Sequence, residues 1–68
     1  MKWHLIITDE TPGEVAFKKI KENLDKINKS VDLRLVSFNT DTVIAESNSQ
    51  AKEVTSAVYE STGVEVTV

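Results

Sequence analysis

The chain contains no cysteine, only one proline and two glycines, and few aromatic residues. Without cysteine it has no disulfide bond, no thiol nucleophile and no thiolate ligand for a metal ion. Neither of the glycine-rich phosphate-binding motifs, G-x-x-x-x-G-K-S/T and G-x-G-x-x-G, is present. The sequence therefore offers no motif for thiol catalysis, thiolate metal binding or nucleotide binding, and we expect no cofactor.

Positive charge and long apolar segments are also scarce. Eleven acidic residues against eight basic ones give a net charge of −3, whereas non-specific binding to nucleic acid requires a basic face that displaces counterions. No apolar stretch approaches the roughly 20 residues that span a bilayer. We expect no nucleic-acid partner and no membrane partner, and a cytoplasmic location if the protein is natural.

The length and composition fit one small globular domain over residues 1–68. Hydrophobic residues make up 40% of the chain and charged residues 28%, which is an ordinary balance for a folded domain. A chain of this size buries only about 60% of the surface of its unfolded form. There is little room for an enclosed active site beside the core, and we expect that the protein is not an enzyme.

The first half of the chain predicts a strand, a turn and a helix. In residues 2–8 the odd-numbered side is the more apolar, which indicates a strand with that side facing the core. The segment Thr11–Glu14 fits a capping box, with the threonine as the N-cap and the glutamate three residues later. Apolar residues at helical spacing continue to about Ile27, and Asn28 is a candidate left-handed residue that ends the helix.

The second half predicts a hairpin, a second helix and a last strand. Ser47 and Gln50 form another possible capping box, and Gly63 is expected to end that helix in the left-handed conformation. The facing of the strand around Ile44 is ambiguous, because its neighbours on both sides are apolar as well. The strands of this half are expected at residues 31–38, 42–46 and 64–68.

The predicted element order is β-α-β-β-α-β. Two right-handed split units of this kind form one four-stranded antiparallel sheet with two helices on one face. The expected fold class is therefore α+β, with the ferredoxin-like arrangement.

Three carboxylates, from Asp9, Glu10 and Glu14, surround the first turn and are the candidate polar site. Paired carboxylates can divide acid and base roles or hold a hard cation. Acidic residues are also favoured at a helix start by the helix dipole alone, and this structural interpretation is the preferred one. His4, the only histidine, has no sequence neighbour that would orient it for catalysis or metal binding, and we interpret it as a surface residue.

The face of the sheet away from the helices is the second candidate site. Simple alternation places Ile6, Val36 and Phe38 on this open sheet face, together with Ile44 if its strand takes that register. An apolar patch of this kind can mark a protein partner or a homodimer interface. Single-stranded RNA is disfavoured as a ligand, because the third strand carries no aromatic residue for base stacking.

The whole chain resembles the heavy-metal-associated domains of copper chaperones and metal-pumping ATPases in its length, element order and loop placement. Those domains carry M-x-C-x-x-C where the first strand meets the first helix, and alignment puts Gly13 and Ala16 at the two cysteines and Thr11 at the methionine. The segment Glu60–Val66 is also similar, since a glycine there ends the second helix before the last strand. The resemblance implies the shape of the domain only, and no metal-binding residue carries over.

No motif in the sequence specifies a biochemical activity. Local signals agree with the fold at nearly every step, which favours a designed or redesigned domain without evolved chemistry. The alternatives are a natural binding module that uses the open sheet face and a relative of the metal domains that has lost its metal site.

Overall fold

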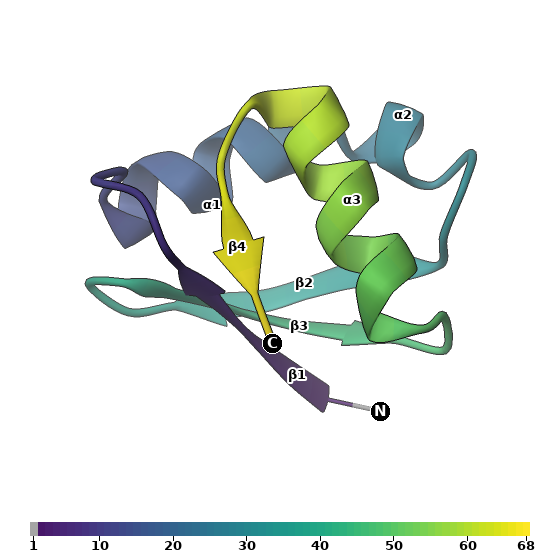
Figure 1. The fold of residues 1–68 in the computed structure, drawn as a ribbon, viewed down its shortest axis with the longest axis horizontal. Coiled ribbons are helices and arrows are strands. Elements are labelled where there is room, and N and C mark those ends of the chain that lie inside the picture. The colour runs from purple at the N-terminus through teal and green to yellow at the C-terminus, as the bar shows by residue number, and fades with distance from the viewer. Residues whose placement is uncertain (1) are drawn as a thin grey trace.

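The computed structural model describes residues 2–68, in which four strands and three helices follow one another along the chain (Figure 1). The elements in chain order are β1 (Lys2–Ile7), α1 (Gly13–Glu22), α2 (Leu24–Ile27), β2 (Leu33–Phe38), β3 (Thr42–Ser47), α3 (Ala51–Thr62) and β4 (Val66–Thr67). None of these helices is long and apolar enough to cross a membrane.

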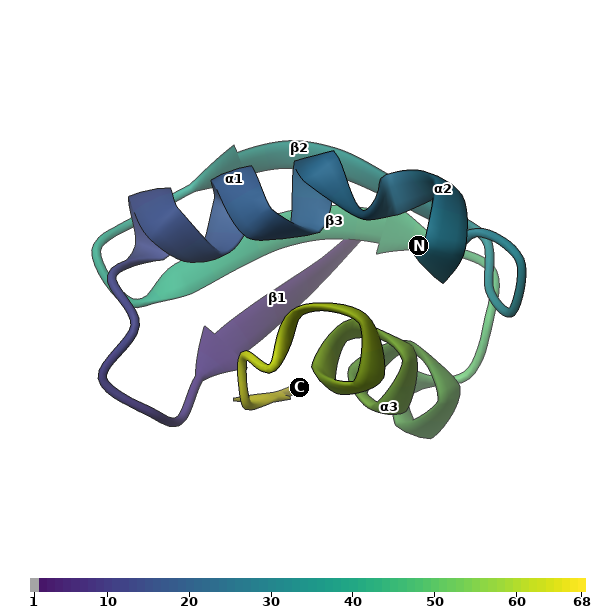
Figure 2. The same ribbon diagram turned by 90° about the horizontal axis from the view of Figure 1, so that it is seen from above.

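The four strands form one sheet in the order β2-β3-β1-β4, and every neighbouring pair is antiparallel. The helices lie together on one side of this sheet (Figures 1 and 2). The prediction of an α+β chain with a four-stranded antiparallel sheet is confirmed. Strand β4 covers only two residues of the five that were expected, so it pairs with β1 at Ile6 and Ile7 alone.

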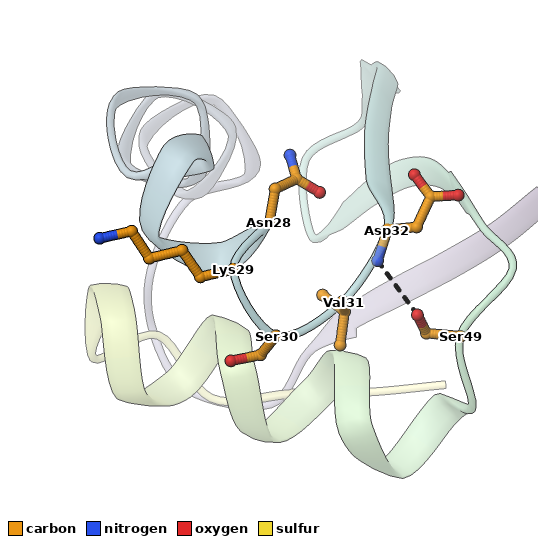
Figure 3. Close-up of a pocket in the computed structure, with 6 residues that line it drawn as sticks. All are labelled: Asn28, Lys29, Ser30, Val31, Asp32 and Ser49. Atoms are coloured by element: carbon orange, nitrogen blue, oxygen red, sulfur yellow. Dashed lines mark hydrogen bonds between the residues drawn. The ribbon is translucent and has the colours of Figure 1, made fainter.

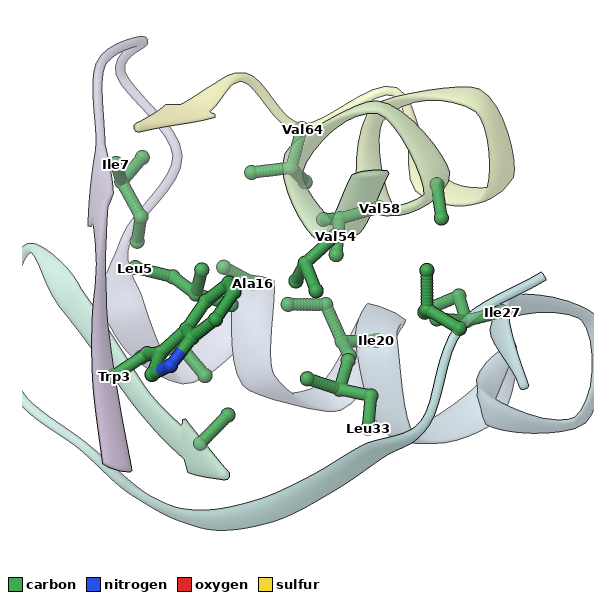
Figure 4. Packing of buried hydrophobic residues seen from close by; sticks show 14 residues of the cluster. Trp3, Leu5, Ile7, Ala16, Ile20, Ile27, Leu33, Val54, Val58 and Val64 are labelled. Carbon is green, nitrogen blue, oxygen red and sulfur yellow. The ribbon is translucent and has the colours of Figure 1, made fainter. Parts of the chain in front are cut away.

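The core fills the space between the sheet and the helices (Figure 4). In β1 the burial alternates strictly, and Trp3, Leu5 and Ile7 are the buried side chains. The helices contribute apolar residues at helical spacing, including Ile20 and Val54, which are both fully buried. The complete core comprises Trp3, Leu5, Ile7, Ala16, Ile20, Ile27, Val31, Leu33, Val43, Ala45, Val54, Ala57, Val58 and Val64.

The facing of β3, which the sequence left ambiguous, is settled by burial. Val43 and Ala45 are fully buried, and Ile44 between them is only partly buried. Ile44 is paired with His4, an exposed residue of β1. Because directly paired residues of antiparallel strands point to the same face, Ile44 belongs to the open sheet face.

The first predicted helix is interrupted at Asn23, so the expectation of one continuous helix to Ile27 is wrong. The Asn23 side-chain amide donates to the carbonyl oxygen of Lys19 at 2.8 Å. Its backbone N–H is shared between the carbonyls of Lys19 and Ile20, both at 3.2 Å. An asparagine side chain that competes for backbone carbonyls in this way disfavours a regular helix. The chain therefore turns at this residue and continues as the short helix α2.

The start of α1 is fixed by a tertiary contact, and the predicted Thr11–Glu14 capping box is wrong. The N-cap residue is Pro12, and no side chain caps the helix. The N–H of Gly13 instead donates to the carbonyl oxygen of Thr40, at 2.7 Å, in the turn between β2 and β3. A Cβ atom at Gly13 would overlap the carbonyl oxygen of Asn39 in the same turn, so this close approach requires glycine.

Two further capping predictions are wrong and one is confirmed. Gln50 is the N-cap of α3 without a side-chain cap, while the Oγ of Ser47 accepts from the N–H of Ser49 at 3.0 Å. Asn28 has a φ of −74°, in the right-handed region, so it does not end a helix in the left-handed conformation. Gly63 does so at the end of α3, with a φ of 78°.

Candidate functional site

The open sheet face carries fewer apolar side chains than simple alternation predicts. Ile6 and Val36 are 45% and 47% exposed. Their strands lie on either side of β3, with Ile44 on the strand between them. Lys2, Glu46 and Arg34 face one another across the same three strands. The face is therefore a short apolar strip that ends in a row of charged residues.

Phe38 does not belong to the open sheet face, so its predicted placement there is wrong. The register between β2 and β3 shifts between Leu35 and Ser37, which leaves Val36 as an extra residue in a β-bulge. After the bulge, Phe38 is paired with the buried Val43 and so points to the helix side. Its ring lies 5.1 Å from that of Phe17 in α1, measured between centroids. One extra residue thus moves the aromatic ring to the opposite face.

A groove with an apolar floor lies on the helix side, between α1–α2 and the outer strand β2. Its volume is about 500 Å³, which lies within the range of small-ligand pockets. We call it the α1–β2 groove. It is lined by Phe17, Lys21, Leu24, Asn28, Leu33, Arg34 and Leu35.

The floor of the α1–β2 groove is apolar and half-buried. Phe17, Leu24 and Leu35 pack against the core but remain partly accessible to solvent, while Leu33 beneath them is 2% exposed. Phe17 and Leu24 flank the fully buried Ile20 on the apolar stripe of the helix. They therefore lie at the margin of the core, where they also line the groove.

Two cationic residues border the α1–β2 groove, namely Lys21 on α1 and Arg34 on β2, and the Arg34 side chain lies on the open-face side beside Glu46. Arg34 contacts Asp32 at 3.5 Å and Glu46 at 3.8 Å, with its side chain 56% exposed. Exposed ion pairs at these distances contribute little free energy. The guanidinium can therefore exchange these contacts for a carboxylate bound on the open-face side of the β2 edge.

At one end of the groove, Asn28 covers the edge of β2. Its Oδ1 accepts from the backbone N–H of Leu33 at 2.7 Å, and its Nδ2 donates to the backbone oxygen of Leu33 at 3.3 Å. A residue of an adjacent antiparallel strand makes the same reciprocal pair of bonds. Asn28 therefore occupies the position that a neighbouring strand would take at Leu33.

The acidic turn is held by backbone hydrogen bonds. The Asp9 carboxylate accepts from the N–H of Thr11 at 2.8 Å and from the N–H of Glu65 at 3.0 Å. The bond from Glu65 is the main reason that the pKa of Asp9 lies below its ordinary value, and the bond from Thr11 is the second. Glu10 and Glu14 are exposed. The role visible for Asp9 is to tie the first turn to the segment before β4.

The part of the chain that the structure describes does not bring metal-ligating groups together. Within residues 2–68, no cluster of three or more histidine, aspartate or glutamate side chains is close enough to hold a metal ion. His4 is exposed on β1. At the positions aligned with the cysteines of heavy-metal-associated domains, Gly13 has no space for a side chain and Ala16 is fully buried.

A second, polar hollow lies between the end of α2 and the start of α3 (Figure 3). Its lining includes the loop residues Lys29 and Asp32, whose side chains point away from each other (Figure 3). The Oγ of Ser49 is already engaged, since it accepts from the N–H of Asp32 at 3.0 Å. This hollow lacks the convergent polar groups that characterise a binding site.

The sequence patterns predicted neither the α1–β2 groove nor the two charged residues, Lys21 and Arg34, that border it. The spacing puts Phe17, Ile20 and Leu24 on one apolar stripe, and it does not distinguish the fully buried Ile20 from the two partly buried residues beside it. Asn28 was interpreted as the end of a helix, and its contact with Leu33 had no counterpart in the local sequence. No family model, no curated protein and no solved structure gives a significant match to this chain.

Proposed function

We propose that this chain is a small protein-interaction module that binds its partner in the α1–β2 groove. The observation that carries the proposal is an apolar, partly exposed floor located at an outer sheet strand and bordered by two cationic side chains. Hydrophobic side chains of a partner would cover Phe17 and Leu24, and this burial supplies the free energy of binding.

We also propose that the fold is the ferredoxin-like β-α-β-β-α-β arrangement, with the first helix divided into α1 and α2. The strand order β2-β3-β1-β4, the antiparallel neighbours and the helices on one side support this assignment. In this arrangement β2 is an outer strand, so its free edge is accessible to a partner.

A selection from a displayed library of random peptides tests the proposed function. The wild-type protein serves as bait, and each enriched peptide is measured against Leu24→Ala and Tyr59→Ala. Leu24 lies in the groove floor, whereas Tyr59 is 54% exposed on α3, away from the groove. We expect peptides that lose about tenfold or more in affinity for Leu24→Ala and bind Tyr59→Ala as they bind the wild type.

The folded state of both variants is checked from the fluorescence of Trp3, which is buried in the core. Enriched peptides that bind the two variants equally would contradict the proposal. Repeated selections that enrich no peptide would also contradict the proposal.

A second candidate is homodimerisation through the open sheet face, which the exposure of Ile6 and Val36 favours. Size-exclusion chromatography with light scattering tests it. A dimer that Val36→Asp converts to a monomer would support this candidate, and a concentration-independent monomer would exclude it.

Two alternatives without an assigned binding partner are a designed or redesigned domain without evolved chemistry and a relative of the heavy-metal-associated domains that has lost its metal site. A designed domain without evolved chemistry predicts that neither the α1–β2 groove nor the open sheet face supports specific binding.

A further inference from the structure

On the basis of the proposed function, we infer that the α1–β2 groove takes an extended peptide segment that adds to the outer edge of β2 as another strand. The segment alternates apolar and acidic side chains. Its backbone pairs with Leu35, its apolar side chain covers Phe17 and Leu24, and its carboxylate lies near Arg34.

The direction of the backbone hydrogen bonds along β2 indicates which backbone groups point to its outer edge. The N–H and carbonyl of Leu33 point outward, because both bond to Asn28. In an antiparallel strand these groups alternate between the two sides from one residue to the next. Those of Arg34 therefore point toward β3, and those of Leu35 point outward again. Within residues 2–68, no hydrogen bond covers the outer side of Leu35.

Asn28 sets the limit and the register of the added strand. It already makes the reciprocal bonds at Leu33, so an incoming backbone cannot pair there without displacing it. The first vacant position is Leu35, which lies in the floor of the groove. The added strand therefore pairs at Leu35 between two limits, which are Asn28 at one end and the β-bulge at Val36 at the other.

The side-chain pattern of the bound peptide follows from the alternation of side chains along a pleated strand. A residue opposite Leu35 points to the helix side, where Phe17 and Leu24 provide an apolar surface. Its two neighbours point to the other side of the sheet, one toward the exposed Arg34 and one toward Val36. Charge complementarity therefore selects a carboxylate at the position that faces Arg34.

The test uses a short capped peptide of alternating valine and glutamate, titrated into the full chain and followed by amide NMR and hydrogen exchange. We expect shifts clustered at Leu24, Arg34 and Leu35, and slower exchange of the Leu35 N–H. A peptide with lysine in place of glutamate is expected to bind about tenfold or more weakly. The same peptide methylated on its valine nitrogens is expected to lose binding, because the valine N–H groups face the edge at Leu35 and can no longer donate to it.

Protein variants test the charge term. Arg34→Gln removes the cation that faces the peptide carboxylate, and Lys52→Gln removes a cation at an exposed position of α3 outside the groove. We expect Arg34→Gln to weaken binding of the valine–glutamate peptide about threefold to tenfold and Lys52→Gln to have little effect.

The outcomes separate the inference from the proposed function. If the N-methylated peptide binds in the groove as tightly as the parent, strand addition is wrong and groove binding stands. If the alternating peptides leave Leu35 unchanged but library-selected peptides depend on Leu24, strand addition is again wrong and the proposed function stands. If neither kind of peptide depends on the groove, both are wrong.

Discussion

The side chain of Asn28 and the backbone of Leu33 form a reciprocal pair of hydrogen bonds, at 2.7 Å and 3.3 Å. The pair links the end of α2 to the outer edge of β2 and satisfies both backbone groups of Leu33. Exposed strand edges promote pairing with other chains unless they are covered or interrupted. Asn28 therefore protects one position of the edge, while the edge at Leu35 stays accessible.

Substitution of Asn28 tests this protective role. We expect Asn28→Ala to lower the free energy of unfolding by about 1–2 kcal/mol, because two backbone groups of Leu33 lose their partners. We also expect more self-association, seen by light scattering. Asn48→Ala removes only an exposed side-chain bond to Asp32 and should stay within about 0.5 kcal/mol of the wild type. Equal urea midpoints for both variants would contradict the role.

The close contact of Gly13 with the β2–β3 turn predicts an effect opposite to helix propensity. Alanine is the better helix former by about 1 kcal/mol, yet a Cβ at this position would overlap the backbone of Asn39. We expect Gly13→Ala to destabilise the fold by about 2 kcal/mol or more, measured by urea unfolding. The control is Ser56→Ala, at an exposed position of α3, where the substitution should be neutral or slightly stabilising. A stabilised Gly13→Ala would show that the turn is not in contact with the helix.

The β-bulge at Val36 predicts an energetic coupling between Phe17 and Phe38. Their rings lie 5.1 Å apart on the helix side of the sheet. A double-mutant cycle with Phe17→Leu and Phe38→Leu should give a coupling of about 0.5–1.5 kcal/mol. A regular strand would put Phe38 on the open sheet face, and the two substitutions would then be additive.

Asp9 predicts a specific acid sensitivity. Its folded-state pKa is lowered, first by the N–H of Glu65 and then by that of Thr11. A lowered pKa gives a stabilising contribution that is complete above the pKa of the unfolded chain. That contribution is lost as the pH falls through the folded-state value. Unfolding curves from neutral to strongly acidic pH should therefore show a steeper loss for the wild type than for Asp9→Asn, which has no carboxyl at this position. If the free energies of unfolding of the wild type and of Asp9→Asn changed in parallel with pH, the acid sensitivity would not come from Asp9.

Periodic features of the sequence predicted most of the fold. The alternation in residues 2–8 gave the buried side of β1, and the apolar stripes gave the buried sides of the helices, because each depends on burial against one surface. Gly63 was predicted correctly because a left-handed residue at a helix end favours glycine for a local reason.

The features that the sequence did not predict depend on contacts between distant segments. The start of α1 is set by the carbonyl of Thr40, and Asn28 is recruited by Leu33 instead of ending a helix. The bulge at Val36 has no local signature, and it transferred Phe38 from the predicted open face to the helix side. The α1–β2 groove went unpredicted for the same reason, since it exists only where the helix and the outer strand meet.

The most direct test of the α1–β2 groove as the binding surface is the affinity of the library-selected peptides for three proteins. These are the wild type, Leu24→Ala in the groove floor and Tyr59→Ala on α3. The account predicts that Leu24→Ala binds about tenfold or more weakly than the wild type, while Tyr59→Ala is unchanged. Equal affinities for all three proteins, or a loss confined to Tyr59→Ala, would contradict it.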